Sequence, residues 1–384
     1  MTTSFPVNKN DSGGIFILRM LNCLYKVEHD VVVPLDRFNL VNSKSNGCLQ
    51  NGEVHTVRYT LLKGNIVSES NFHGGFPDAF NKRPWVFILY PLMLFAMFRE
   101  VLRLIGNNSI VHVHWLPNGL IGVLVKKLKN VPIVITLRGS DQKLIDLKIL
   151  RPLWQWILSE ADAVTTVSQT LANRVTNEFS LQKKTFFIPN GVDITVKKEK
   201  KDNSDFKLIF VGSLTHNKNV NLLLLALTNL SHRGDIKLTI IGDGPERESL
   251  LNYVQKNGLI EFVHFHGIAP PSEVTKIMSN HDCLVLPSQS EGMPNVVKEA
   301  MACSLTVIAT NVGGVPELIT HGEQGLLFKP GDERALTAYI ELLAEDREKA
   351  KAMGKEGRKL IIEKNLTWEN TAKQYLNVYR RISS

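Results

Sequence analysis

Two glutamates, Glu291 and Glu299, flank a turn in the stretch SEGMPNVVKEA. The run DCLVLPS before it is typical of a strand, and Pro294 suits the first position of a helix, where no backbone N–H is missed. The free amides and positive dipole end of a helix start favour a diphosphate, while each carboxylate can accept hydrogen bonds from sugar hydroxyls. The stretch therefore suits a nucleotide sugar. Alternatively, both glutamates only favour the helix dipole, worth ~0.3–1 kcal/mol each.

Glycine-rich turns recur along the chain at positions where a strand passes into a helix. Such turns let phosphates approach helix amides at the carboxyl ends of strands. They are NDSGG (10–14), VGSLTHNKN (211–219), GDGPE (242–246), SEGMPN (290–295) and NVGGVPE (311–317). Four of the five lie in the second half of the chain, which indicates a nucleotide or phosphate site there.

Short β-branched runs alternate with helical patterns and position these turns. This alternation predicts an α/β fold with parallel sheets covered by helices on both faces. The runs are HDVVVPL, IVHVHWL, VPIVITLRG, ADAVTTVS and KTFFIPN, then FKLIFVGSL, IKLTIIGDG, FVHFHGI, HDCLVLPS and LTVIATN. Between the two sets, residues 194–205 are charged and lack apolar periodicity, so we expect a linker between two domains.

The front of the chain departs from this alternation. MTTSFPVNKNDSGG is typical of a loop and leads into a helix near Ile15, whereas every other unit opens with a strand. One interpretation is a peripheral loop before the sheet. The other is that the first strand of the sheet is missing.

The motifs together resemble the retaining GT-B glycosyltransferases of glycosyltransferase family 4. The segment from Ser290 to Asp332 is similar to the family's donor-binding region, with its Glu-x7-Glu spacing at Glu291 and Glu299. Four further segments extend the resemblance over nearly the whole chain. They are IPNGVD (188–193), FVGSL with a following lysine (210–218), IIGDGPE (240–246) and LTWENTAKQYLNVY (366–379). The resemblance implies two Rossmann-like, doubly wound parallel-sheet domains facing across a cleft.

The resemblance also implies domain limits. Residues 1–193 would form the acceptor-side domain, 206–367 the donor-binding domain, and the last helix, 368–384, would cross back to pack on the first domain. The activity implied is transfer of a sugar from a nucleoside-diphosphate sugar to an acceptor hydroxyl with retention, in polysaccharide or glycoconjugate biosynthesis. The acceptor would be a sugar or a lipid-linked sugar.

Residue roles follow from the same resemblance. Glu299 would bind the donor ribose, Glu291 the transferred sugar and Lys218 the diphosphate. Expected catalytic residues are Glu291, Lys218, His114 and Arg138. The other expected donor-side residues are Gly212, Ser213, Gly242, Gly244, Gly292, Met293, Pro294 and Asn295, and the acceptor-side residues are Gly13 and Gly14.

Two positions depart from the family pattern. Ser213 stands where many members have arginine, which leaves Lys218 as a point charge on the phosphates. Arg138, in TLRGSD, replaces a histidine; it cannot act as a general base, but its charge can stabilise a leaving phosphate. These departures keep two alternatives open: a GT-B nucleotide-sugar epimerase, and a non-catalytic GT-B partner subunit.

A bound metal or cofactor is not expected. His112 and His114 point to one face of a strand, but nearby residues supply no further ligands. The chain contains no Asp-x-Asp sequence, so we expect Lys218 and helix amides to neutralise the diphosphate. Cys23, Cys48, Cys283 and Cys303 show neither disulfide nor zinc-ligand spacing.

Charge is uneven along the chain. Residues 1–200 carry 24 Lys and Arg against 15 Asp and Glu, whereas residues 201–384 carry 21 against 22. The basic first half fits an anionic partner, either phospholipid headgroups or a phosphorylated acceptor, although a solvated lysine face is the simpler and preferred interpretation. The apolar run 85–98, with Pro91 in it, is too short to span a bilayer and favours a helix packed inside the first domain. The start of the sequence does not resemble a signal peptide, so we expect a cytoplasmic protein. Peripheral binding at the inner face of the membrane is an alternative that stays open. We expect no nucleic-acid partner.

Overall fold

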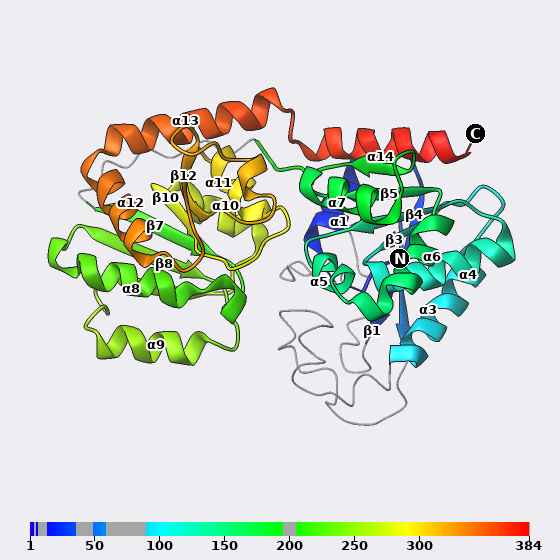
Figure 1. Ribbon diagram of the computed structural model, residues 1–384, viewed down its shortest axis with the longest axis horizontal. Coiled ribbons are helices and arrows are strands. Elements are labelled where there is room, and N and C mark those ends of the chain that lie inside the picture. The colour runs from blue at the N-terminus through cyan, green and yellow to red at the C-terminus, as the bar shows by residue number, and fades with distance from the viewer. Residues whose placement is uncertain (4, 7–13, 36–48, 59–89, 195–204, 384) are drawn as a thin grey trace. The chain divides into compact units, whose positions relative to one another are not determined.

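The chain divides into two compact units, each described here by itself. The computed structural model describes residues 1–383 except for 4, 7–13, 36–48, 59–89 and 195–204. Unit 1 comprises Met1–Asn190 and Trp368–Ser384, and unit 2 comprises Gly191–Thr367 (Figure 1). Most of the predicted linker 194–205 and part of the apolar run 85–98 lie outside the described residues.

Unit 2 contains a parallel sheet with the strand order β12-β11-β10-β7-β8-β9. Its strands are β7 (Phe206–Val211), β8 (Ile236–Ile241), β9 (Val263–Gly267), β10 (Cys283–Leu286), β11 (Thr306–Thr310) and β12 (Gly325–Phe328). From β7, the strands β8 and β9 follow toward one edge of the sheet, whereas β10, β11 and β12 follow toward the other. The strand order therefore reverses between β7 and β10. In open α/β sheets, ligands bind beyond the carboxyl ends of the strands at such a reversal.

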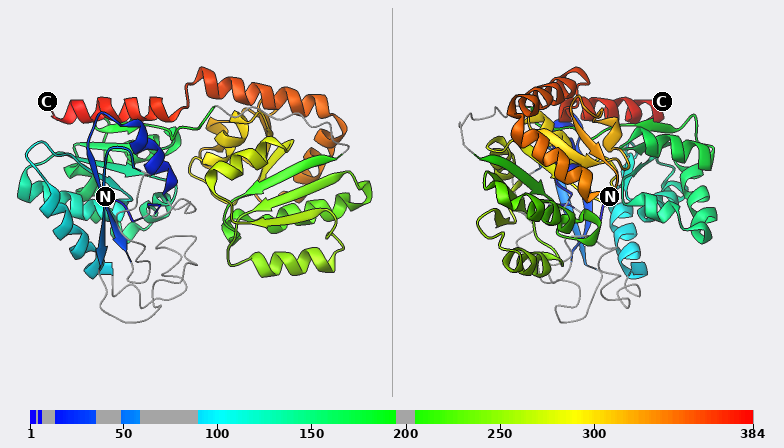
Figure 2. Two further views of the ribbon diagram at one scale, coloured as in Figure 1. Left: turned by 180° about the vertical axis from the view of Figure 1, so that it is seen from behind. Right: turned by 60° about the vertical axis from the view of Figure 1, so that its left-hand side comes forward.

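Helices cover both faces of this sheet, as Figure 2 shows. One layer holds α8 (Val220–Leu230), α9 (Arg247–Lys256) and α12 (Glu333–Glu345), and α8 contacts both of the others. The other layer holds α10 (Pro271–Ser279), α11 (Asn295–Ala302) and α13 (Arg347–Glu363), and α11 contacts both of the others. Between them, β10 and β11 are buried at every position, whereas the edge strand β9 alternates between buried and partly exposed positions. This agrees with a parallel sheet enclosed by helices.

Unit 1 contains two groups of parallel strands. The first pairs β1 (His29–Leu35) with β2 (Gly52–Arg58), and the second has the order β3-β4-β5-β6. Its members are β3 (Val111–His114), β4 (Ile133–Leu137), β5 (Ala163–Thr166) and β6 (Thr185–Phe187). All ten predicted strand runs are therefore confirmed, and the sequence missed β2 and β12.

Two apolar clusters fill unit 1, one on each side of its strands. The first lies with α3 (Tyr90–Leu104), α4 (Gly119–Lys129), α6 (Arg151–Glu160) and α7 (Gln169–Phe179). The second lies with α1 (Ile15–Cys23) and α14 (Trp368–Ser383), where Ile17 and Leu21 pack in one cluster with Tyr375 and Val378. The short helix α5 (Asp141–Ile145) follows β4. The last helix thus belongs to the core of unit 1.

Helix α3 contains the described part of the apolar run. It spans Tyr90–Leu104, and Pro91 is its second described residue. Met93 and Met97 are fully buried, as the packing interpretation predicts, whereas Leu92 and Phe95 are 53% and 59% exposed. No helix within the described residues is long and apolar enough to cross a membrane.

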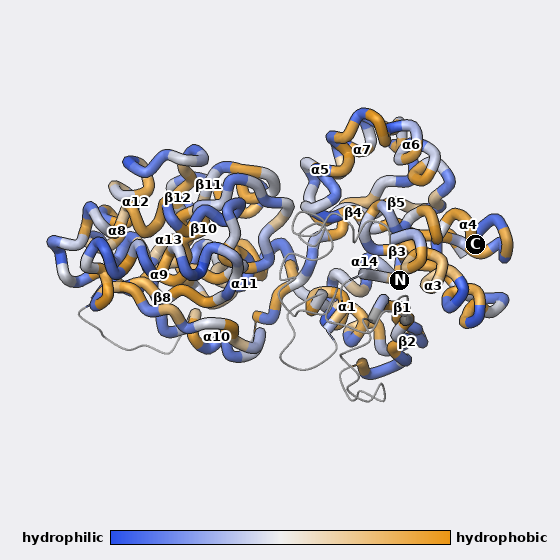
Figure 3. The backbone as a smooth tube through the Cα atoms, turned by 90° about the horizontal axis from the view of Figure 1, so that it is seen from below, coloured by the Kyte–Doolittle hydropathy of each residue, from blue (hydrophilic) through white to orange (hydrophobic). Residues whose placement is uncertain are grey.

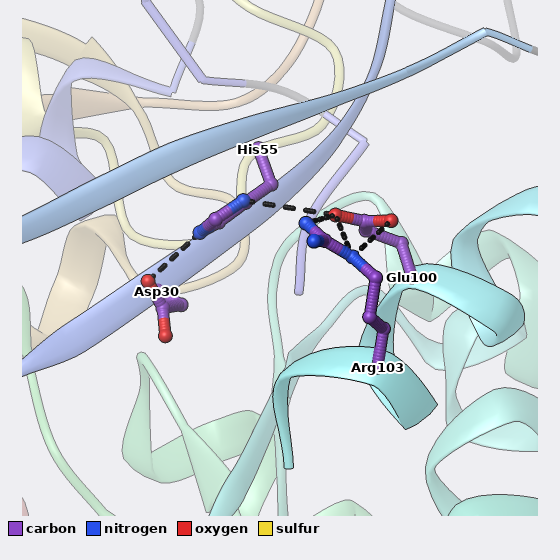
Figure 4. A network of polar contacts seen from close by, with 4 residues as sticks. All are labelled: Asp30, His55, Glu100 and Arg103. Carbon is purple, nitrogen blue, oxygen red and sulfur yellow. Dashed lines mark hydrogen bonds and ion pairs between the residues drawn. The ribbon is translucent and has the colours of Figure 1, made fainter.

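A polar network joins β1, β2 and α3 (Figure 4). His55 Nε2 lies 2.9 Å from Asp30 Oδ1, and His55 Nδ1 lies 3.6 Å from Glu100 Oε1. Arg103 donates to Glu100 and thereby holds the pKa of that carboxyl below its usual range. The network attaches the edge strand β2, whose polar alternation made it invisible as a strand run, to the helix beside it.

Candidate functional site

An ion pair lies where the strand order of unit 2 reverses. Lys218 ends the short 3₁₀ turn after β7, and Glu291 lies in the loop after β10. Lys218 Nζ is 2.6 Å from Glu291 Oε1, with side chains 21% and 9% exposed. The pair is therefore short and only partly hydrated, so its charges interact more strongly than a surface pair would. Two residues 73 positions apart meet because β7 and β10 are neighbours in the sheet.

Asn217 ties the two loops together beside this pair. Its side-chain amide donates to Ser290 O at 3.0 Å, and its own carbonyl accepts from Gln289 N at 2.8 Å. On the far side of the second loop, Thr310 Oγ1 donates to the carbonyl of the fully buried Ser288 at 2.6 Å. These bonds fix the backbone that carries Glu291, and so they fix where its carboxylate can reach.

Two glycines permit close backbone approach around the pair. A Cβ at Gly242 would lie 1.9 Å from Gly212 O, and one at Gly313, where φ is +55°, would lie 1.8 Å from Glu291 O. Gly314 N in turn donates to Gly292 O. Any side chain at Gly242 or Gly313 would push a loop of the site away, which is the physical reason for glycine in these turns.

Helix α11 starts beside Glu291. It begins at Asn295, and Pro294 precedes it as the N-cap, one residue earlier than the first helical position predicted for it. Its N-cap Pro294 makes no side-chain cap bond, and the start of a helix is a place where backbone amides can donate to an anion. Glu299 lies four residues into the helix and is half-buried. Helical side chains lean toward the N-terminus, which directs its carboxylate back over Asn295.

The predicted donor-side residues thus meet at one end of the unit 2 sheet. Met293 and Pro294 are buried beneath the helix start. Ser213 lies in the turn after Gly212, and its carbonyl accepts from Thr215 N at 3.0 Å. A Cβ at Gly244 would lie 2.4 Å from Leu214 O. The turns after β7, β8 and β10 therefore pack on one another through backbone.

Unit 1 holds a second polar cluster, around Arg138. Arg138 Nη2 lies 3.2 Å from His114 Nδ1, and Nη1 lies 3.3 Å from Asn190 Oδ1. The guanidinium carbon stands 3.8 Å from the centroid of the Phe16 ring. Arg138 Nε is buried and has no partner among the described residues. The structure thus brings His114 and Arg138 together.

Burial sets the protonation of this cluster. Desolvation lowers the pKa of Arg138 to about 10 and the pKa of His114 well below its usual value. A neutral His114 can accept from Arg138 at Nδ1, which places its proton on Nε2. Desolvation also raises the pKa of Asp141 to about 6, opposed by amides of Leu116 and Arg138 that donate to its carboxylate at 2.8 and 2.7 Å.

His112 stands beside the Arg138 cluster, and the rings of His112 and His114 lie 4.2 Å apart. This confirms that the two histidines share a face. His112 Nδ1 lies 2.7 Å from Tyr379 Oη, and Nε2 lies 2.6 Å from Thr136 Oγ1. Both ring nitrogens of His112 are therefore used by structural partners, one of them on α14.

Of the two expected acceptor-side glycines, Gly14 is described. It has a φ of 69° and precedes α1, two residues before Phe16. Gly13 lies outside the described residues. The start of α1 therefore lies close to the guanidinium of Arg138, since Phe16 packs against it.

Sequence reasoning missed four residues of these clusters. Asp141 and Asn190 orient Arg138 and its loop, Asn217 joins the donor-side loops, and Lys298 is fully buried in α11. Asp141 carried a signal, because an aspartate in the first turn of a helix, as in α5, interacts favourably with the helix dipole. Asn190 and Asn217 act through contacts distant in sequence, which no local pattern indicates.

Two family models match the chain in succession. "Glycosyltransferase Family 4" matches residues 55–196, and "Glycosyl transferases group 1" matches residues 192–360. An uncharacterized glycosyltransferase of Methanocaldococcus jannaschii is 31% identical over 289 residues, covering 73% of this chain and 79% of that protein. The N-acetyl-alpha-D-glucosaminyl L-malate synthase of Bacillus anthracis is 30% identical over 304 residues, covering 76% and 79%.

Solved structures show the same fold. The crystal structure of Anabaena HepE in complex with UDP has a TM-score of 0.75 to this chain and covers 97% of both chains at 18% identity. The predicted GT-B fold, with two Rossmann-like parallel-sheet units, is confirmed.

Proposed function

Because the chain belongs to the family of glycosyl transferases group 1, we propose that it moves a hexose from a nucleoside-diphosphate sugar to an acceptor hydroxyl with retention. The observation that carries this proposal is the Lys218–Glu291 pair beside the start of α11. One small region thereby offers a cation and helix amides for a diphosphate, and carboxylates for sugar hydroxyls.

The leaving diphosphate is the group that this region stabilises. Breaking the bond to the anomeric carbon places negative charge on the diphosphate and positive charge on the sugar ring. Lys218 and the amides after Pro294 stabilise the first charge, and Glu291 favours the second. The diphosphate takes the acceptor proton, so no protein nucleophile is needed. The UDP bound to HepE in its crystal structure supports a nucleotide-sugar donor.

A divalent ion is not required in this mechanism, because Lys218 and the helix amides supply the positive charge. The absence of any Asp-x-Asp sequence agrees with this. A chelator should leave the transfer rate unchanged. A rate that falls on chelation and returns with magnesium or manganese would contradict metal independence and leave the sugar-transfer proposal standing.

Paired substitutions test the residue roles. Glu299→Ala should weaken binding of the sugar-free nucleoside diphosphate ~10- to 150-fold, since a hydrogen bond to a charged group contributes ~1.5–3 kcal/mol. Glu291→Gln should not weaken that binding, but should slow single-turnover transfer ~100-fold by removing a contact made to the developing ring charge. Calorimetric titration and quenched-flow transfer measure the two effects, with the exposed Glu363→Gln as the control.

The results also separate the rival functions. Equal losses of binding from Glu299→Ala and Glu291→Gln would contradict the assigned roles, and small losses of stability alone would favour the helix-dipole interpretation. Conversion of the donor to a new hexose without acceptor would identify an epimerase. Binding of the donor with no turnover under any acceptor would identify a non-catalytic subunit.

We also propose that unit 1 presents the acceptor at an anionic membrane surface, in polysaccharide or glycoconjugate biosynthesis. Helix α3 exposes Leu92 and Phe95 and carries Arg99 and Arg103 further along, and Figure 3 colours most of α3 as hydrophobic. Exposed apolar side chains beside basic ones are typical of interfacial helices. Binding to liposomes should rise with phosphatidylglycerol content and weaken with salt. Equal binding to neutral vesicles, or none, would contradict this.

A further inference from the structure

Arg138 is a charged side chain that the proposed mechanism does not use. Burial lowers its pKa to about 10, so the guanidinium stays charged at neutral pH. Among the described residues, no carboxylate forms an ion pair with it. A charge taken out of water is costly unless an opposite charge and hydrogen bonds replace the water. The described part of unit 1 therefore holds a shielded cation without a charged partner.

The hydrogen-bond partners of Arg138 are neutral. Nη1 donates to Asn190 Oδ1, Nη2 donates to His114 Nδ1, and the Phe16 ring covers one face of the guanidinium. A guanidinium carries five N–H donors, so these two bonds leave three without an acceptor within the described residues. One of the three, on Nε, is buried. Buried donors normally have partners, so the unused donors indicate a ligand.

Asp141 does not supply the missing charge. It attracts the guanidinium from a distance, but its carboxylate accepts from the backbone amides of Leu116 and Arg138 at 2.8 and 2.7 Å. Burial raises the pKa of Asp141 to about 6, so its own charged form is disfavoured. The side-chain donors of Arg138 stay available to another anion.

The first turn of α1 lies against the same guanidinium. Phe16, the second residue of α1, has its ring centroid 3.8 Å from the guanidinium carbon. The N-cap is Gly14, which has no side chain to cap the helix, and the first turn contains no acidic residue. The amides and the positive dipole end of a helix start attract anions. Two features that favour an anion therefore come together in unit 1.

A phosphate group fits these donors better than a carboxylate does. Guanidinium groups bind phosphate through two parallel N–H bonds. A phosphate ester offers three acceptor oxygens in a tetrahedral arrangement, so it can meet the guanidinium and the helix amides from different directions. The two oxygens of a carboxylate lie in one plane. Residues 1–200 also carry 24 Lys and Arg against 15 Asp and Glu, an excess that attracts anionic substrates.

We propose that Arg138 and the first turn of α1 form an anion site that binds a phosphate group of the acceptor. This inference rests on the proposed function, in which unit 2 holds the donor diphosphate. The acceptor is then a phosphorylated sugar or alcohol, and its phosphate supplies the charge that Arg138 lacks. His114 and Asn190 hold the guanidinium and leave its other N–H groups for the phosphate oxygens. A neutral acceptor leaves those donors unpaired, which disfavours it.

Titration of the full chain with inorganic phosphate tests the site without donor or turnover. Calorimetry at constant ionic strength compares the parent with Arg138→Gln, which removes the charge, and Arg138→Lys, which keeps the charge but loses the planar fork. Arg138→Gln should weaken phosphate binding at least ~10-fold and Arg138→Lys ~3- to 10-fold. The control Arg151→Gln changes an exposed arginine of unit 1 and should have no effect.

Lys218→Gln separates this phosphate site from the donor site of unit 2. Phosphate binding that survives Lys218→Gln and is lost in Arg138→Gln supports the proposal. Binding that is lost in Lys218→Gln, alone or together with Arg138→Gln, would place the ion on the donor diphosphate and overturn it. No binding to the parent beyond that of chloride would also overturn it. If Arg138→Gln does not fold by circular dichroism, Arg138→Lys decides, and binding equal to the parent's would overturn the proposal.

Donor turnover with matched acceptors then tests the substrate class. Glucose is compared with glucose 6-phosphate, and glycerol with glycerol 3-phosphate, so that each pair differs only in the phosphate. The phosphorylated member should have a kcat/KM ~100-fold higher, and Arg138→Gln should abolish this preference while Arg151→Gln keeps it. Preference for the neutral members would overturn the phosphorylated acceptor and leave sugar transfer standing. Phosphate binding that depends on Arg138, with no transfer to any acceptor, would support the anion site and count against the proposed function.

Discussion

The two units fix their charged groups by different means. In unit 2, the loops that carry Lys218 and Glu291 are held by backbone bonds and by glycines that let carbonyls approach. In unit 1, Arg138 is held by side chains from separate elements, Phe16, His114 and Asn190. A site built from backbone depends on a few local sequence motifs. A site built from side chains depends on the packing of the whole unit.

The largest loss of stability should come from adding a side chain at a glycine of unit 2 where two backbone segments touch. Gly313→Ala should destabilise the chain by ~3–5 kcal/mol, because the new Cβ would lie 1.8 Å from Glu291 O at a positive φ. Gly258→Ala is the control: its φ is also positive, at +67°, but it faces open space, so ~1–2 kcal/mol is expected. Urea unfolding compares them, and equal losses would refute the role of backbone contact.

The pH dependence of unit 1 should be the next largest effect. The folded pKa of Asp141, about 6, exceeds its ordinary value of 3.8, so protonation stabilises the fold. This contribution is fully present below about pH 4 and is lost as pH rises through about 6, by up to about 3 kcal/mol.

Asp141→Asn tests this assignment, because it removes the titrating group and keeps one acceptor oxygen. The variant should lose the fall in unfolding free energy between pH 4 and pH 6 that the parent chain shows. A variant with the same pH profile as its parent would show that other groups cause the dependence. Urea unfolding at a series of pH values gives both profiles.

A double-mutant cycle on Lys218 and Glu291 sharpens the comparison further. We expect a coupling energy of ~1–2 kcal/mol, between values for exposed and buried pairs, because both side chains are mostly shielded. The control is the Lys351–Glu348 pair, which has a similar separation of 2.7 Å but is exposed; ~0.5 kcal/mol or less is expected. Similar couplings for the two pairs would contradict the shielding argument.

The smallest effect concerns the helix that closes unit 1. Tyr379→Phe should cost ~1 kcal/mol, because it removes the 2.7 Å bond to the buried His112. Tyr375→Phe should cost less, since its hydroxyl lies 3.4 Å from Thr136 Oγ1 and a bond of that length is weak. Thermal unfolding of both variants measures the difference, and a larger loss from Tyr375→Phe would reverse this ranking.

Much of the architecture could be predicted because it is local. Buried parallel strands are largely apolar, so ten of the twelve strands in the part of the chain that the structure describes were visible as runs. Strand β2 is a polar edge strand, and β12 (GLLF) contains no β-branched residue, so neither gave a clear run. The glycine turns and Glu291 were found from motifs, but their meeting with Lys218 depends on β7 and β10 being neighbours. The contacts of Arg138 with Asn190 and Phe16 could not be predicted, because tertiary packing alone joins these residues.

The order of the chain through the two units has a consequence for synthesis on the ribosome. Unit 1 begins the chain, but its core includes α14, and Thr371 in that helix donates to Pro189 O. Residues 191–367 must therefore be translated before the first unit receives its last helix. Unit 2, which starts second, can complete its fold first. Until α14 emerges, His112 lacks its tyrosine partner, and the nascent first unit exposes the apolar face that Tyr375 and Val378 later cover.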